Sequence, residues 1–218
     1  MIKLRPFFFG LKKSHTHLIL DLASLARLYG TPPEASIKKE IDHVHAYYQA
    51  FIEAAPFAVL ATSGPAGMDA SPRGDPAGFV VVENPKLLLL PDRRGNNRVD
   101  SLANIVSDRR VALLFLIPGV GETLRVNGHA DISIEPALLR RFAVGGKEPR
   151  SVLVVHVETV YFQCSRAIAR SKLWDPATRI ERRSLPSTGT NLASLSNASI
   201  DGETYDATRD ERVKATLT

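Results

Sequence analysis

Cysteine is almost absent from this 218-residue sequence, in which Cys164 is the single example. One cysteine cannot form a disulfide within the chain, and it cannot build a zinc site from several thiolates. A lone cysteine is more often structural than reactive, so we assign it no chemistry. Disulfides are typical of oxidising compartments, and their exclusion favours a reducing one. We therefore expect the protein to be cytoplasmic.

Long hydrophobic runs are also missing. The apolar residues near the N-terminus, "FFFGL" at 7–11, form a stretch shorter than the hydrophobic region of a signal peptide, and Lys12 and Lys13 end it. No run approaches the roughly 20 apolar residues that a membrane-spanning helix needs. We therefore expect no signal peptide and no association with a membrane.

Aromatic residues make up 7% of the sequence, and its charge excess is small. With 28 Lys and Arg against 23 Asp and Glu, the formal net charge is +5, which favours an anionic partner without identifying it. Nucleic-acid binding usually shows a continuous basic stripe with interleaved aromatic residues. Here the arginines cluster near the ends of predicted strands instead, so we expect no nucleic-acid partner.

Common catalytic and metal-binding motifs are absent. The sequence contains no GxSxG, no Walker phosphate loop and no GxGxxG. Of its six histidines, His43 and His45 lie two positions apart, which on a helix turns their rings about 200° away from each other. They cannot share a metal ion in that arrangement. We predict no metal site, and the residues alone identify no catalytic group.

Hydrophobic spacing predicts two helices in the first quarter of the chain. Apolar residues recur at helical intervals over 21–29, where Asp21 can cap the start and Gly30 can end the helix. The same spacing over 37–55 predicts a second, longer helix with Ser36 as its N-cap.

From residue 57 onward the pattern changes to short apolar runs separated by turn residues. These runs predict strands in hairpins at 57–63, 68–78, 79–91, 111–117, 122–134 and 152–164, with short helices at 98–108 and 135–143. Parallel strands would need a crossover helix between each pair, so the pattern favours an antiparallel barrel, mainly β with flanking helices. We expect an N-terminal extension over 1–20, a barrel domain with its N-terminal helices over 21–175, and a C-terminal tail or peripheral wrap over 176–218.

A basic corner separates the apolar run "LLLL" from the helix predicted at 98–108. The corner reads "DRRGNNR" and places Arg98 where the helix begins, while Arg73 in "SPRGD" and Arg125 in "ETLRVNG" lie on other strands. A terminal phosphate is bound well by forked guanidinium groups together with free N–H groups at a helix start. A solvated turn is the alternative, but it would not need Arg73 and Arg98 in separate segments.

The order of five segments carries a family resemblance: "PFAVLAT", "SPRGDPAGF", "LLLPDRRGNNRVDSLANI", "VALLFLIPGVGETLRVNGHA" and "CSRAIARSKLW". Together they resemble the pyridoxamine 5′-phosphate oxidase-like FMN-binding split-barrel family, and more closely its branch of probable FMN-dependent enzymes. The resemblance covers about residues 20–210, and 71–130 is its most specific part. It implies an antiparallel split β-barrel that forms a homodimer, with FMN bound between the two subunits.

The resemblance also implies which residues bind the FMN phosphate. Arg73 matches a basic residue on an early strand, and Asn97 with Arg98 matches a basic pair at the helix start. Asn97 departs from the usual arginine, so Arg93, Arg94 or Arg125 could substitute for it.

For the flavin ring, the resemblance implies a second group of residues. Pro91 and Asp92 match the strand end that runs beside the ring, and Thr123 matches a position near it. Trp174 resembles a late aromatic residue that reaches the cofactor, although packing in the protein core would explain it equally well.

The function implied by the resemblance is that of an FMN-dependent oxidoreductase acting on a small molecule, with a nicotinamide cofactor as a potential electron donor. Enzymes that oxidise pyridoxamine phosphate carry Arg-x-His near the C-terminus, whereas no histidine follows His156 in this sequence. This difference argues against that specific activity. A flavin binder without catalysis, and a relative that has adapted its pocket to haem or a deazaflavin, are the alternatives within the fold.

Overall fold

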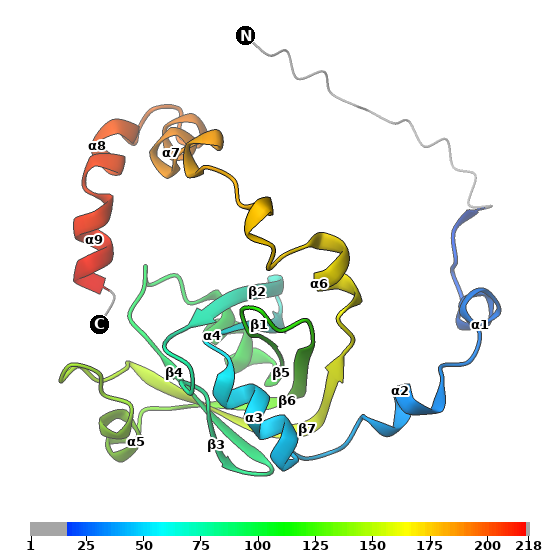
Figure 1. Ribbon diagram of the computed structural model, residues 1–218. Coiled ribbons are helices and arrows are strands. Elements are labelled where there is room, and N and C mark those ends of the chain that lie inside the picture. The colour runs from blue at the N-terminus through cyan, green and yellow to red at the C-terminus, as the bar shows by residue number, and fades with distance from the viewer. Residues whose placement is uncertain (1–16, 217–218) are drawn as a thin grey trace. The chain divides into compact units, whose positions relative to one another are not determined.

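The computed structural model describes residues 17–216, which divide into two compact units, one ending at Lys38 and one beginning at Lys39 (Figure 1). The first unit contains α1 (Leu22–Tyr29) and α2 (Glu34–Lys38). The Asp21 side chain accepts a 2.7 Å hydrogen bond from the Ser24 amide and caps α1, as predicted. Gly30, with a φ of 69°, ends the helix.

The prediction of one helix over 37–55 is wrong. Ser36 lies inside α2, and a new helix, α3 (Ala46–Ala54), begins after His45, whose side chain caps it. Between the two helices, the backbone of Ile41 exchanges hydrogen bonds of 3.0 and 2.7 Å with Val160. These bonds to a distant strand take up the backbone groups that a continuous helix would pair internally, so tertiary pairing overrides the helical spacing.

The second unit is built around one antiparallel sheet with helices beside it (Figure 1). In the described residues its strands run in the order β2-β1-β5-β6-β7-β4-β3. Their bounds are β1 Phe57–Gly64, β2 Gly67–Gly74, β3 Val81–Asn84, β4 Leu87–Asp92, β5 Arg110–Leu116, β6 Thr123–Ser133 and β7 Ser151–Gln163. The flanking helices include α4 (Asp100–Ser107) and α5 (Pro136–Arg141). This confirms the predicted mainly β, antiparallel class, and the sheet is not closed, because β2 and β3 lie at its two ends.

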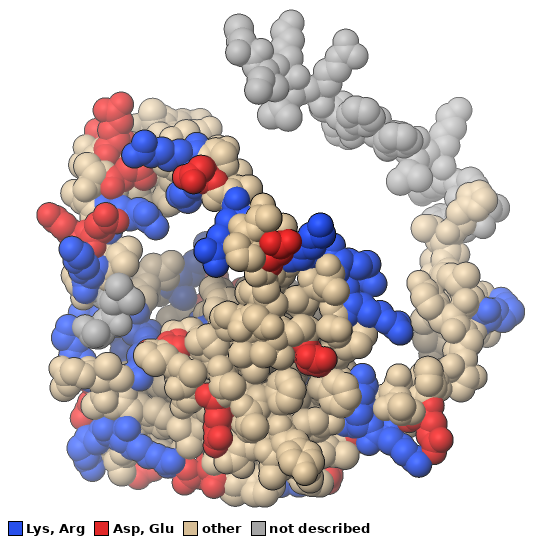
Figure 2. Space-filling view, in the orientation of Figure 1, with Lys and Arg blue, Asp and Glu red and all other residues tan. Residues whose placement is uncertain are grey.

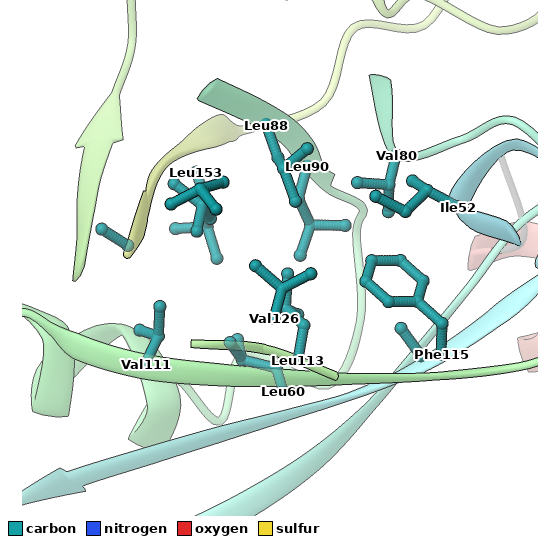
Figure 3. Packing of buried hydrophobic residues seen from close by; sticks show 14 of the residues in the cluster. Ile52, Leu60, Val80, Leu88, Leu90, Val111, Leu113, Phe115, Val126 and Leu153 are labelled. Carbon is teal, nitrogen blue, oxygen red and sulfur yellow. The ribbon is translucent and has the colours of Figure 1, made fainter. Parts of the chain in front are cut away.

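The sheet curves around a dry hydrophobic core. Figure 3 shows side chains from β1, β5 and β6 facing those of β4 and β7, with α3 covering one end. Fully buried members of this cluster include Leu60, Leu113, Val126, Leu88, Leu90, Leu153 and Ile52. Burying one such side chain stabilises the fold by about 1.5–3 kcal/mol. The curvature brings the inner face of β2 close to the end of β4, although the two strands are not neighbours in the sheet.

The chain after β7 is mostly helical, which the sequence did not predict. It contains α6 (Arg166–Ser171), the short turns η2 (Pro176–Thr178) and η3 (Arg182–Ser184), and the helices α7 (Thr188–Leu195), α8 (Gly202–Ala207) and α9 (Arg209–Thr216). Helices α7 and α8 approach closely at two glycines, because a Cβ on Gly189 would lie 2.0 Å from the Gly202 carbonyl oxygen.

Charged residues are spread unevenly over the surface. On the face shown in Figure 2, Lys and Arg form separate groups with Asp and Glu among them, and much of the middle of that face is uncharged. Among the described helices, none has the length and apolar character needed to cross a membrane.

Candidate functional site

A polar pocket of about 620 Å³ lies where β2 approaches the end of β4 and the start of α4. It gathers five of the residues predicted from the sequence, Arg73, Asp92, Arg93, Asn97 and Arg98. An adjoining cavity of about 210 Å³ is lined by Pro91 and shares Arg73, Asp92 and Arg93 with the pocket. Six of the nine predicted cofactor-binding residues therefore lie together in the folded chain.

Strand β2 presents polar side chains toward the inside of the sheet. Its register sets Arg73 opposite the buried Ala58 and Ser71 opposite the buried Leu60. Residues two apart on a strand point to the same face, so Asp69 joins them. At this end of the sheet the inner face is therefore polar and forms one wall of the pocket.

Arg73 is the most enclosed basic group in the pocket, with 20% of its side chain exposed. Its Nη1 donates hydrogen bonds to Ser71 Oγ at 2.8 Å and to the Pro72 carbonyl oxygen at 3.2 Å. Its Nη2 lies 3.8 Å from Asp92 Oδ1. Among the described residues, nothing accepts a hydrogen bond from its buried Nε. A buried donor without an acceptor is costly, and Arg73 therefore has hydrogen-bonding capacity that the described residues do not satisfy.

Asp92 ends β4 on the side of the pocket opposite β2, and 18% of its side chain is exposed. Burial raises the pKa of its carboxyl group, while the nearby Arg73 and Arg150 act in the opposite direction. Burial is the larger effect, so this carboxyl group ionises less readily than an exposed aspartate.

The loop between β4 and α4 contains Arg93 and Asn97, which make different contacts. Arg93 is tied to the pocket wall, because its Nε donates to Asp75 Oδ2 at 2.7 Å and its Nη1 to the Phe142 carbonyl oxygen at 2.6 Å. Asn97 has a φ of 64°, a left-handed conformation that asparagine adopts more readily than most residues. Its Oδ1 accepts a 2.9 Å hydrogen bond from Arg150 Nη1.

Arg98 precedes α4 and differs from Arg73 in exposure and partner. Its side chain is 78% exposed, and its Nε donates to Asp100 Oδ2. Val99 occupies the N-cap position of α4 and makes no side-chain capping bond. The first backbone N–H groups of α4 thus lack a side-chain acceptor from the N-cap, and the positive end of the helix dipole faces the pocket rim.

Helix α4 is fixed on the sheet by one buried polar contact. Asn104 Nδ2 donates to Thr62 Oγ1 at 3.1 Å, and both residues are buried. The contact requires a glycine at position 64, since a Cβ there would lie 2.3 Å from Asn104 Oδ1. Ser101 Oγ also donates to Asp69 Oδ2, which connects the start of α4 to β2.

Three predicted residues lie away from the pocket in the described chain. Arg125 is on the outer face of β6 and donates a 2.7 Å hydrogen bond to the Tyr161 hydroxyl. Thr123 begins β6 opposite Gln163. Trp174 Nε1 donates to the Val120 carbonyl oxygen at 2.7 Å, fastening the segment after α6 to the loop between β5 and β6.

The pocket also contains residues that the sequence analysis missed. Asp69 and Ser71 could have been found from their alternation with Arg73, which sets three polar residues on one strand face. Arg150 lies 52 positions after Arg98, and no local pattern connects the two. Arg150 reaches the pocket because β7 pairs with β4 and sets its neighbour Ser151 opposite Asp92.

Comparisons with known proteins find solved structures of low sequence identity that match part of this chain. HupZ of Group A Streptococcus is 17% identical over 56% of this chain and 95% of its own, with a TM-score of 0.46. General Stress Protein 26 of Bacillus anthracis is 16% identical over 52% and 88% of the two chains, with a TM-score of 0.40. An FMN-binding protein of Syntrophomonas wolfei is 11% identical over 65% and 95%, with a TM-score of 0.40. A comparison with curated proteins found no match.

The family assignment rests on a match to a family rather than on these structures. The family described as pyridoxamine 5′-phosphate oxidase matches residues 44–164. This segment is more than half of the chain, runs from just before α3 to the end of β7, and includes every residue that lines the pocket. The chain belongs to the pyridoxamine 5′-phosphate oxidase family.

Proposed function

We propose that this protein binds FMN in the arginine-lined pocket and uses it to oxidise or reduce a small molecule. The observation that carries the proposal is the buried Nε of Arg73, which lacks an acceptor among the described residues. A phosphate oxygen would supply that acceptor. The family of the chain and the donors around Arg73 support the same ligand.

The residues present fit a phosphate group. Arg73 offers a forked guanidinium from β2, and Arg98 offers a second one beside the uncapped start of α4. Forked donors and a helix N-terminus are features of phosphate sites. Pro91 and Asp92, at the end of β4, would then lie beside the ring. FMN supplies the redox chemistry when bound, and the protein holds it and controls access to it.

A second subunit would account for the predicted residues that lie away from the pocket. The outer face of β1 and β5 carries the apolar, half-buried Val59 and Leu114, and the register continues this row to Arg125 on β6. An apolar row on an outer sheet face is stabilised when another surface covers it. We propose that two subunits meet at this face, so that Arg125, Thr123 and Trp174 approach the pocket of the partner.

Flavin titration tests the proposed ligand. The purified protein should bind FMN and quench its fluorescence, and riboflavin should bind much more weakly because it lacks the phosphate. Added salt should narrow this difference only in part, since sheltered charges are screened less than exposed ones. Equal affinity for both flavins would contradict the phosphate site, and no binding of either would contradict the flavin proposal.

Anaerobic reduction tests the proposed activity. A reduced nicotinamide cofactor added to the FMN-loaded protein should bleach the flavin absorbance, and an oxidising substrate should restore it. Bound flavin that no nicotinamide donor reduces would contradict the proposed electron source.

A further inference from the structure

We propose that Arg150 is a phosphate-binding residue of this pocket. The inference rests on the proposed FMN site and identifies a residue that determines the preference of this site for a phosphate-bearing flavin.

The sheet brings Arg150 to the pocket. Its backbone amide donates a 3.2 Å hydrogen bond to the Asp92 carbonyl oxygen, and the next residue, Ser151, begins β7 opposite Asp92. The backbone of Arg150 is thereby fixed beside the end of β4. Its side chain lines the same pocket as Arg73 and Arg98.

The hydrogen-bond partner of Arg150 distinguishes it from Arg93 and Arg98, which line the same pocket. Arg93 is paired with Asp75 and Arg98 with Asp100. Arg150 donates to the neutral Asn97 side chain, and within residues 17–216 it forms no ion pair. A guanidinium group has five N–H donors, so one neutral acceptor leaves most of its donors available to a ligand, while its charge also acts on the nearby Asp92.

The conformation of Asn97 suits an asparagine. Asn97 has a φ of 64°, in the left-handed region that asparagine adopts more readily than most residues. The Asn97 amide then serves as an acceptor that orients Arg150. We infer that Asn97 is a positioning residue and that Arg150 contacts the phosphate.

Titrations of FMN and riboflavin against four proteins test the inference. The proteins are the wild type, Arg150→Ala, Arg150→Gln, and the control Arg140→Ala, which removes an equal charge from an exposed position on α5. Loss of a charge-assisted hydrogen bond should weaken FMN about 10- to 100-fold in both Arg150 variants. Riboflavin affinity should change less than about twofold, since one weak contact at most is lost. The control should bind both flavins like the wild type.

The outcomes separate this inference from the proposed function. If the wild type shows no preference for FMN over riboflavin, the phosphate site itself is wrong. If the wild type prefers FMN and both Arg150 variants keep that preference, only the role of Arg150 is wrong. Equal weakening of both flavins would show a structural role and would also overturn the inference. Should Arg150→Ala fail to fold, Arg150→Gln decides, because its amide can still donate to Asn97.

Discussion

At the scale of single residues, the charged groups of the pocket neutralise one another to different extents. Arg73 is enclosed and lies 3.8 Å from a partly buried carboxyl group, whereas Arg98 is exposed and directly paired with Asp100. Exposed ion pairs contribute little and are screened by solvent, while enclosed charges act more strongly on a ligand. The two arginines should therefore contribute unequally to anion binding.

We predict that removing the partner of Arg98 strengthens FMN binding. Asp100→Asn frees the Arg98 side chain and removes a negative charge near the phosphate, so FMN affinity should rise about two- to fivefold, which is the scale of one charge at a helix N-terminus. Fluorescence titration measures this change. The matched change Asp210→Asn, in the first turn of α9, should leave affinity unaltered. A fall in affinity for Asp100→Asn would contradict the prediction.

A pH prediction follows from Asp92, whose pKa is raised above the ordinary value of 3.8, first of all by burial. Because the folded state holds this proton more tightly than the unfolded state, Asp92 contributes stability at low pH that is lost as pH rises through its folded pKa. The Asp92→Asn variant has no titratable carboxyl group at this position, so it does not lose this stability as pH rises. The free energy of unfolding of the variant minus that of the wild type should therefore increase as pH rises above about 4.

Urea denaturation of the flavin-free proteins over a pH series measures that difference. A constant cost of the substitution, such as altered packing, shifts all points equally and does not alter the trend. The attraction between Arg73 and Asp92 is part of the pH-dependent difference, because it requires an ionised carboxyl group. A difference that decreases with rising pH would show that ion pairing, not burial, controls Asp92.

At the scale of elements, the position of α4 depends on the contact between Asn104 and Thr62. Gly64→Ala would put a Cβ 2.3 Å from Asn104 Oδ1, so the side chain must move and its hydrogen bond is strained or lost. We predict a loss of about 1–3 kcal/mol in stability, from a buried hydrogen bond and overpacking. FMN affinity should also fall, because the start of α4 shifts away from the pocket.

A double-mutant cycle identifies the cause of this loss. Asn104→Ala removes the side chain that the new methyl group meets, so the double variant should be more stable than the sum of the single changes predicts. Additive effects would show that Gly64 acts through something other than Asn104.

At the scale of the whole molecule, the proposed composite site, a pocket completed by residues of a second subunit, implies that dimerisation and flavin binding are linked. If only the dimer binds FMN fully, FMN must shift the equilibrium toward the dimer. Leu114→Lys places a charge in the proposed contact on β5, and it should favour the monomer and weaken FMN at least tenfold, the result of losing about 1.4 kcal/mol or more.

Sedimentation of the flavin-free and flavin-loaded proteins over a dilution series measures this linkage. Ile134→Lys, at a position with an exposed apolar side chain outside the proposed contact, serves as the control and should leave both properties unchanged. A monomer that retains FMN at full affinity would exclude the composite site.

Features that depend on neighbouring residues were determined by the sequence alone. Asp21 and Gly30 mark the two ends of α1 through contacts within a few positions. The short apolar runs form strands because any β arrangement buries their side chains, and burial stabilises the fold. The corner at 92–98 predicted a polar site because a strand end, three arginines and a helix start are adjacent in the chain. Arg73 belongs to the same site, and the alternation of polar residues that places it on the inner face of β2 is also a local pattern.

Features that depend on distant pairing were decided only by the tertiary structure. The helix predicted over 37–55 is interrupted because Ile41 pairs with Val160, and Arg150 enters the pocket because β7 pairs with β4. The ion pair between Arg98 and Asp100 joins residues only two positions apart, but it depends on side-chain conformation and was therefore also decided by the structure. Hydrogen bonds across more than a hundred positions leave no periodic trace in the sequence, whereas caps, turns and strand alternation do, since their partners lie within a few residues.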